Sequence, residues 1–149
     1  MKTRSKFNVS KDKSKRTFDG IVFDSIVEMK FYKEYVLPKH ENGEILEYEM
    51  QKQYELQPKF SYMGKSVRAI NYVADYVITY ADGHMEVIDI KGQETSDFKI
   101  KKKLFEYKYP DTIFKCISWS HIDGGWIETD DLKKARRERK KEKAAKNKQ

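Results

Sequence analysis

Two aspartates and a lysine in the middle of the chain have the residue types of a metal-assisted hydrolytic site. Asp75 lies in one run rich in β-branched and aromatic residues, and Asp89 and Lys91 lie in the next. A short segment ending in Gly83 separates the two runs, which is typical of a β-hairpin. Carboxylates bind hard divalent cations, and an amine beside such a cation can help to activate water against a phosphodiester.

The length of the hairpin loop decides whether these side chains meet. A three-residue loop, residues 81–83 with the glycine left-handed, places Asp75 opposite Asp89. Lys91 then shares the face of both carboxylates, because side chains alternate along a strand. A two-residue loop would put the aspartates on opposite faces. We predict the three-residue loop; in the alternative interpretation, Asp75 and Asp89 cap strand ends and Lys91 is a solvated edge charge.

A helix is predicted to precede the hairpin. Ser25 and Glu28 have the spacing of a capping box where a helical apolar pattern starts, and Pro38 is predicted to end that helix. Glu28 has two interpretations. It is either the reciprocal cap for Ser25 or a third metal carboxylate that leans toward Asp75 and Asp89.

Strand patterns fill the segment between this helix and the hairpin. Residues 44–56 are predicted to form one or two strands, with a break at Pro58. Residues 60–62 and 66–70 flank a glycine-containing turn and predict a second hairpin. This end of the sheet is therefore expected to be antiparallel.

A lysine-rich helix is predicted after the site. Thr95 is a good N-cap, and the helix is expected to reach Tyr107 or Lys108. Its apolar line is Ile100, Leu104 and Tyr107, widened by Phe98 and Phe105. Its lysines either contact the phosphates of a nucleic acid or form only a solvated face; they are Lys99, Lys101, Lys102 and Lys103.

The last third of the chain completes the predicted sheet. Residues 112–119 suit a buried strand, and a strand, a crossover helix and a strand predict a parallel, right-handed connection. Residues 120–126 are a predicted loop, and the last helix is predicted from about Asp131. The fold class is therefore α/β, a single domain over residues 17–132 with a central mixed β-sheet flanked by helices.

Charge is unevenly distributed over the 149 residues. The net charge is +7, but residues 2–16 carry +6 and residues 133–148 carry +8, which leaves −7 for residues 17–132. Residues 1–16 and 133–149 are therefore predicted to be basic, flexible arms that attract a polyanion. The other interpretation is that they only aid solubility or nonspecific binding.

Several protein classes are disfavoured. No apolar run is long enough to span a bilayer and no signal peptide is evident, so no membrane partner and a cytoplasmic location are expected. The single cysteine, Cys116, lies in an apolar run and is expected to be a reduced core residue. The sequence has no P-loop, zinc-ligand spacing or Gly-x-Ser-x-Gly elbow.

In order and spacing, these segments resemble the PD-(D/E)xK nuclease superfamily, whose restriction-endonuclease-like fold is shared by many restriction enzymes and Holliday-junction resolvases. The similarity is greatest to small phage-encoded members and spans roughly residues 18–119. The first motif has Ala74 where the superfamily often has proline. The matching segments are Phe23-Asp24-Ser25 with Glu28, Leu46 to Leu56 around Gln51, Val73-Ala74-Asp75-Tyr76, Val87-Ile88-Asp89-Ile90-Lys91-Gly92, and Thr95 with Lys101-Lys102-Lys103-Leu104-Phe105.

The resemblance implies a metal-dependent DNA endonuclease that acts on branched or recombination intermediates, in the host cytoplasm if phage-encoded. It implies that Asp75, Asp89 and the carbonyl of Ile90 bind Mg²⁺ or Mn²⁺, with Glu28 acting through water or on a second ion. Lys91 would orient and help to deprotonate the attacking water. Such enzymes commonly form homodimers to cut two strands.

Contacts with nucleic acid are expected on the same grounds from Gln51, Thr95, Lys99, Lys101, Lys102 and Lys103. Two other functions stay open at this point. One is a non-catalytic nucleic-acid-binding module on a nuclease-like fold, and the other is a structural or regulatory phage protein that binds another protein through its basic tails. Adjacent acids facing a polyanion argue against the binding module.

Overall fold

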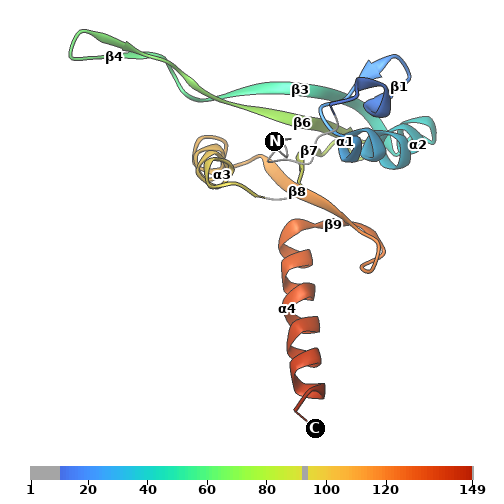
Figure 1. The fold of residues 1–149 in the computed structure, drawn as a ribbon. Helices are drawn as coiled ribbons and strands as arrows, with labels where there is room; N and C mark the ends of the chain where they lie inside the picture. The colour runs from blue at the N-terminus through green and yellow to red at the C-terminus, as the bar shows by residue number, and fades with distance from the viewer. Residues whose placement is uncertain (1–10, 92–93, 149) are drawn as a thin grey trace.

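The computed structural model describes residues 11–91 and 94–148 (Figure 1). A five-stranded mixed sheet in the order β3-β6-β7-β8-β9 forms its centre. In this sheet β7 and β8 pair in parallel, and the other neighbouring strands pair in antiparallel. The predicted α/β fold class and the parallel strand–helix–strand connection are confirmed. The strands are β3 (Ile45–Gln57), β6 (Ile70–Tyr80), β7 (Met85–Ile90), β8 (Ile113–Ser120) and β9 (Gly125–Glu128).

Three consecutive helical segments cover one end of the sheet: α1 (Ile26–Phe31), the π-helical η2 (Tyr32–Val36) and α2 (Leu37–Glu41). The predicted N-cap is confirmed, because the Glu28 N–H donates to Ser25 Oγ at 3.1 Å. The side chains of Phe31, Tyr32 and Val36 are buried in the core beneath these segments.

The predicted helix end at Pro38 is wrong. Pro38 lies in the first turn of α2, and the helical backbone continues to Glu41. In the turn before it, the Leu37 N–H bonds to the carbonyl of Tyr32, which is the wider π-helical spacing. A proline disrupts a regular α-helix through its missing donor and a ring clash one turn back. The π-helical turn changes that spacing where Pro38 enters.

The chain before α1 is folded against the domain. A 3₁₀ turn, η1 (Lys13–Arg16), leads into the two-residue strands β1 (Thr17–Phe18) and β2 (Ile21–Val22). The Arg16 guanidinium donates to the carbonyl of Phe23 at 2.5 Å. The predicted flexible N-terminal arm is therefore ordered from η1 onward. Its first ten residues lie outside the described residues, as do Gly92 and Gln93.

A second hairpin extends from the sheet. Strands β4 (Phe60–Tyr62) and β5 (Lys65–Val67) pair in antiparallel, as predicted, around the left-handed residues Met63 and Gly64. Figure 1 shows this hairpin at the end of a long two-stranded projection that continues β3 and β6 away from the helices. We call residues 57–69 the arm.

Helix α3 (Ser96–Lys108) packs on the sheet through part of its predicted apolar face. Phe98 and Phe105 are buried, whereas Ile100 and Tyr107 are 59% and 88% exposed. Phe98 and Phe105 are two helical turns apart and therefore lie on one side of the helix. The aromatic rings that were predicted to widen the apolar line determine the packed face, and Leu104 packs beside them. The prediction is wrong for Ile100 and Tyr107, which do not pack there.

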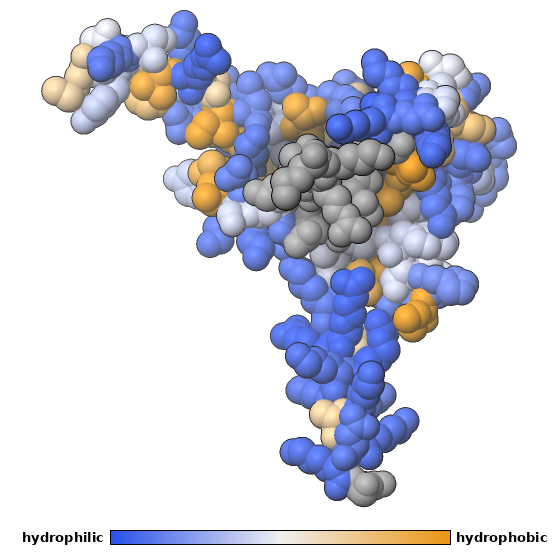
Figure 2. Space-filling model, viewed as in Figure 1, coloured by the Kyte–Doolittle hydropathy of each residue, from blue (hydrophilic) through white to orange (hydrophobic). Residues whose placement is uncertain are grey.

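The C-terminal region contains a strand that was predicted to be a loop. Residues 121–124 form the turn, and β9 follows directly, pairing Trp126 with Trp119. Helix α4 (Thr129–Lys146) then starts two residues before the predicted position and continues through most of the predicted flexible tail. In Figure 1 it projects from the sheet, and Figure 2 shows it almost wholly hydrophilic. Arg139 holds it to the turn through two hydrogen bonds to Asp123, at 2.6 and 3.1 Å.

No helix in the described part of the chain is long and apolar enough to cross a membrane.

Strand β6 is packed on opposite faces at its two ends. Tyr76 and Ile78 belong to the core under α1 and η2, whereas Tyr72 and Ala74 belong to the core under α3. In a regular strand these four even-numbered residues would share one face. Strand β6 therefore exchanges its faces next to Asp75.

Strand β3 makes the same exchange directly opposite. Met50 contacts the α1 core, but Tyr54 and Leu56 pack in the α3 core. Between them Gln51 has a left-handed backbone, with φ 57°, and the pairing register is the same on both sides of it. A left-handed non-glycine residue inside a strand is uncommon and costs conformational free energy. The exchange brings the two helical layers together around Asp75.

Candidate active site

The β6–β7 hairpin has the register that brings the two aspartates together. Its pairs run from Thr79 with Met85 to Tyr76 with Ile88, and the Tyr80 N–H donates to the carbonyl of His84 at 2.9 Å. One position further on, this register places Asp75 opposite Asp89. The predicted three-residue loop is confirmed, with Gly83 left-handed at φ 89°.

Asp75 replaces a backbone acceptor where the β6–β7 pairing stops. The Ile90 N–H donates to Asp75 Oδ2 at 2.8 Å instead of to a carbonyl of the neighbouring strand. Burial raises the pKa of Asp75 to about 8, and the negative charges of Asp89 and Glu28 raise it in the same direction. Asp75 therefore shares an acidic environment with both other candidate carboxylates.

Asp89 is almost completely buried, with 2% of its surface exposed. Tyr72 Oη donates to Asp89 Oδ2 at 2.5 Å, and Lys91 Nζ lies 2.9 Å from Asp89 Oδ1. Burial raises the pKa of Asp89, while the Lys91 charge and the Tyr72 hydroxyl act to lower it. Oδ1 is buried without a well-directed hydrogen bond and has the Lys91 ammonium as its ion-pair partner.

Lys91 is held from several directions. Its N–H donates to the carbonyl of Ile117 at 2.9 Å, and its own carbonyl accepts from Ser118 Oγ at 2.7 Å. Its ammonium lies 4.2 Å from the centre of the Phe98 ring. These contacts tie Lys91 to β8 and α3, so the amine beside Asp89 is positioned by the sheet and by the helix that follows it.

Glu28 faces the same region from the first turn of α1. Tyr76 Oη donates to the Glu28 carbonyl at 2.9 Å, which joins the start of the helix to β6. Burial raises the pKa of Glu28 to about 7, and the charges of Asp24 and Asp89 raise it as well. The hydrogen bond from the Glu28 N–H to Ser25 coexists with the proximity of the carboxylate to the aspartates, and both predicted roles of the Glu28 side chain stay predictions.

A small cavity of about 80 Å³ opens between these elements. Glu28 and Asp75 line it, together with Asp24 and the left-handed Gln51. Gln51, predicted to contact nucleic acid, thus lies beside the carboxylates at the point where β3 exchanges faces. The remaining lining residues are apolar or aromatic side chains of β2, β3 and β6, and Phe23, which follows β2.

The other predicted nucleic-acid residues are divided by α3. Lys99 and Lys103 are exposed, whereas Lys101 and Lys102 are half-buried beside the packed face, and Lys102 pairs with Glu106. Thr95 is the N-cap, with Oγ1 accepting from the Phe98 N–H at 3.2 Å. The helix therefore presents two of its four predicted lysines fully to solvent.

The donor chemistry of the site fits a hard divalent cation. Carboxylate and carbonyl oxygens are the ligands that Mg²⁺ and Mn²⁺ prefer, and Asp89 Oδ1 is a buried oxygen without a directed hydrogen bond. Within residues 11–91 and 94–148, however, no three Asp, Glu, His or Cys side chains are close enough together to hold a metal ion. A metal site here would use Asp75 and Asp89 with the Ile90 carbonyl, and Glu28 through water.

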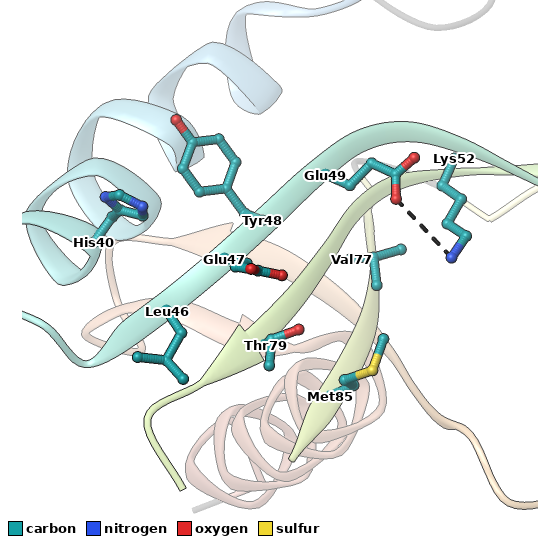
Figure 3. Close-up of a pocket in the computed structure, with 9 residues that line it drawn as sticks. All are labelled: His40, Leu46, Glu47, Tyr48, Glu49, Lys52, Val77, Thr79 and Met85. Carbon is teal, nitrogen blue, oxygen red and sulfur yellow. Dashed lines mark ion pairs between the residues drawn. The ribbon is translucent and has the colours of Figure 1, made fainter. Parts of the chain in front are cut away.

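A larger hollow than the cavity beside Asp75 lies elsewhere on the described surface. It is an open depression of about 560 Å³ on β3, β6 and β7, and none of the four candidate catalytic residues lines it. Figure 3 shows Glu49 and Lys52 paired at its edge, with 3.9 Å between Oε2 and Nζ. Val77, Thr79 and Met85 form much of its floor. Its two acids, Glu47 and Glu49, are exposed rather than buried, so we place the chemistry at Glu28, Asp75 and Asp89 instead.

Four residues at the site were not singled out from the sequence. Tyr72 donates to Asp89, and Ser118 joins Lys91 to α4 through Thr129, with 3.0 Å between the two hydroxyl oxygens. Asp24 and Glu94 add negative charge near Glu28 and Asp89, respectively. The position of Asp24 directly before the Ser25 cap was the one available signal. The others depend on the face exchange and on the packing of α3 and α4.

Comparison with known proteins gives a family. A search of curated proteins found no match. A family profile described as "Protein of unknown function (DUF1064)" matches residues 4–121, a segment that contains Glu28, Asp75, Asp89 and Lys91. Because the match covers more than half of the chain, this protein belongs to the DUF1064 family.

Proposed function

We propose that this protein is a metal-dependent endonuclease that hydrolyses phosphodiester bonds of DNA, with branched or recombination intermediates as its substrates. The observation that carries the proposal is the arrangement of three mutually repelling carboxylates around one lysine, with Glu28 and Asp89 buried and Asp75 half-buried. Asp75 and Asp89 face each other across β6 and β7, Glu28 approaches from α1, and Lys91 Nζ lies 2.9 Å from Asp89. Buried like charges are costly unless a proton or a cation relieves them.

The donor set supports Mg²⁺ or Mn²⁺ as the cofactor. Asp75, Asp89 and the Ile90 carbonyl would hold the ion, and Glu28 would contribute through water. When bound, such an ion lowers the pKa of a water ligand and screens the charge of the phosphate. The raised pKa values of Asp75 and Glu28 belong to the metal-free protein, in which bound protons partly neutralise the carboxylates in place of a cation.

The chain's own residues account for the remaining steps. Lys91 Nζ, positioned by Asp89 and the Phe98 ring, would hold the attacking water and stabilise the charge that develops on the phosphate. Glu28, whose pKa burial raises to about 7, is suited to exchanging a proton with that water near neutral pH. Tyr72 fixes the orientation of Asp89.

The charge distribution supports a nucleic-acid substrate. Helix α4 carries most of the C-terminal positive charge on a hydrophilic surface (Figure 2), and Lys99 and Lys103 are exposed on α3. A surface of this kind neutralises backbone phosphates and increases the rate of encounter with DNA. A homodimer would allow both strands of a duplex to be cut.

A nuclease assay tests the proposal directly. Labelled branched, duplex and single-stranded DNA are incubated with the protein in Mg²⁺ or in EDTA, and Asp75→Asn is compared with Asp111→Asn, which changes an exposed carboxylate in a turn. We expect cleavage in Mg²⁺ only, lost in Asp75→Asn and retained in Asp111→Asn. Tight, salt-sensitive binding without cleavage would instead support a non-catalytic binding module.

Tyr72 offers a narrower prediction. Tyr72→Phe removes the hydroxyl that donates to Asp89 and keeps the ring in the α3 core. Because groups that orient a metal ligand typically contribute 10–100-fold to metal affinity or activity, we expect a loss of roughly that size. The pKa of Asp89 should also rise, since the hydroxyl acts to lower it, so the pH–rate profile should shift to higher pH. An unchanged profile would show that Tyr72 only packs.

A further inference from the structure

The arm has a composition unlike the rest of the domain. No Asp or Glu occurs between Glu55 and Asp75, while Lys59, Lys65 and Arg68 are basic and exposed. This local charge contrasts with the net −7 of residues 17–132. A basic segment that projects from an acidic domain is suited to contact with a polyanion away from the acidic surface.

The tip of the arm also exposes large apolar side chains. Phe60, Tyr62 and Met63 are 44%, 65% and 85% exposed, and β4 has no buried residue. Figure 2 shows hydrophobic residues at the end of the projection, next to strongly hydrophilic ones. The left-handed residues Met63 and Gly64 form the turn that joins β4 to β5 at this tip. Covering these exposed apolar side chains with another apolar surface would lower the free energy.

The root of the arm is fixed, so its direction is determined by the fold. Tyr109 Oη donates to the carbonyl of Glu55 at 2.9 Å, and Lys108 Nζ lies 3.3 Å from Glu55 Oε1. The Tyr54 and Phe105 rings also meet edge to face, with their centres 5.1 Å apart. Helix α3 therefore holds the strands at the position where the arm leaves the sheet.

We propose that the arm binds single-stranded segments of DNA, with Phe60 and Tyr62 stacking on unpaired bases and Lys59, Lys65 and Arg68 contacting the phosphates. Base faces are apolar surfaces that become accessible where a duplex is opened, and aromatic residues among basic ones are the usual means of binding them. This inference extends the proposed function, on which it rests, by assigning the recognition of unpaired strands to a segment outside the carboxylate site.

The geometry separates recognition from chemistry. About ten residues separate Lys65 from Asp75, which at about 3.3 Å per residue is on the order of 30 Å. The arm would therefore hold a strand several nucleotides away from the scissile phosphate. A second copy of this chain is a poorer occupant, because a stable protein interface takes roughly 20–30 residues from each partner and the arm tip presents three large apolar side chains.

The test measures binding in EDTA, so that its result does not depend on cleavage. Fluorescence anisotropy gives the affinities of the full-length protein for a single-stranded 20-mer and for the matching duplex. The variants are Phe60→Ser, Tyr62→Ser and Tyr62→Phe, and the matched control is Ile122→Ser, which removes an apolar side chain that is 78% exposed on the β8–β9 turn. A 2-aminopurine base in the single strand reports stacking through the quenching of its fluorescence.

We expect each serine variant to lose roughly tenfold or more in affinity for the single strand and to lose part of the quenching, with little change for the duplex. Tyr62→Phe, which keeps the ring, should retain both signals, and Ile122→Ser should behave as the wild type. Replacing Lys59, Lys65 and Arg68 by glutamine should make the binding less sensitive to salt. The slope of log K against log[salt] should decrease in magnitude by about 0.7 for each lost phosphate contact.

Two results would overturn the arm proposal. One is equal single-strand affinity and quenching in all variants. This result would refute the role of the arm without contradicting the proposed nuclease function, which cleavage in Mg²⁺ tests separately. The other is a change of oligomeric state in the serine variants, measured by light scattering, with no change in DNA binding; it would identify the tip as a contact between copies. Conversely, selective loss of single-strand binding in a protein that never cuts DNA would support the arm and refute the proposed chemistry.

Discussion

Asp89→Asn is expected to abolish Mg²⁺ binding and DNA cleavage together, whereas Lys91→Ala is expected to keep Mg²⁺ binding and lose turnover. Asparagine keeps the shape of aspartate and an oxygen that can accept from Tyr72 Oη, but it lacks the charge that a hard cation needs. The metal affinity of Asp89→Asn should therefore fall by a hundredfold or more, which exceeds the usual effect of changing an outer-shell group. Isothermal titration with Mg²⁺ and single-turnover cleavage measure the two losses separately.

Lys91→Ala removes the amine and leaves both carboxylates. The expected loss of turnover is roughly 10²–10⁴-fold, the usual contribution of a group that assists proton transfer or stabilises developing charge. Because the Lys91 charge lowers the pKa of Asp89, its removal should raise that pKa, so Mg²⁺ binding must be compared at pH 8.5, where the carboxylate is more fully ionised. Lys39→Ala is the matched control, since it removes a lysine that pairs with Glu44 outside the site.

The pattern of the two losses separates the hypotheses. If Asp89→Asn binds Mg²⁺ as tightly as the wild type, the carboxylates are not the metal ligands and the proposed chemistry is wrong. If Lys91→Ala cuts at the wild-type rate in saturating Mg²⁺, the lysine serves only to neutralise Asp89. The ion pair at 2.9 Å is compatible with both roles of the lysine, so the rate measurement is decisive.

The juxtaposition of Asp75 and Asp89 could be predicted from the sequence because a short loop determines a hairpin register. Gly83 supplies the left-handed residue that a three-residue loop needs, which fixes the pairing of the two strands. The alternation of side chains along each strand then places both aspartates on the same face. The N-cap at Ser25 was equally local. Features that depend on residues close in sequence were therefore predictable. The role of Glu28 stayed open between a cap and a metal ligand, because its position depends on how α1 packs on β6.

The surroundings of the site depend on events that leave no local pattern. Gln51 has no composition signal for a left-handed backbone, yet it marks the exchange of faces that brings Tyr72 to Asp89. Strand β9 begins at Gly125, and glycines indicate turns rather than strands. A proline usually ends a helix, but Pro38 is tolerated here after a π-helical turn. Tertiary packing overrode local preference in each case.

Stability of the metal-free protein is expected to fall as the pH rises from 5.5 to 8.5. Burial raises the pKa of Asp75 to about 8 and that of Glu28 to about 7, above the ordinary values of 3.8 and 4.5. The folded state therefore binds more protons than the unfolded state between pH 5.5 and 8.5, so the free energy of unfolding decreases as the pH rises. The stabilisation by these protons is fully present below the ordinary pKa values and is lost as the pH rises through 7 and 8. With about 1.4 kcal/mol for each pKa unit, and allowing for partial solvent screening, we expect a loss of roughly 2 kcal/mol in the free energy of unfolding.

Urea unfolding in EDTA at the two pH values measures this loss. Asp75→Asn keeps an oxygen that can accept from the Ile90 N–H and removes the charge. Its stability should therefore fall less than that of the wild type between pH 5.5 and 8.5, because only the raised pKa values of Glu28 and Asp89 remain, and it should be higher than that of the wild type at pH 8.5. Asp111→Asn should follow the wild type, since it changes only an exposed turn. Mg²⁺ should restore the stability of the wild type at pH 8.5 and leave Asp75→Asn unchanged, because a cation replaces the lost protons only where both aspartates are present. If the stability of the wild type rises over this pH range, the carboxylates are not buried together, and the proposed metal site is wrong.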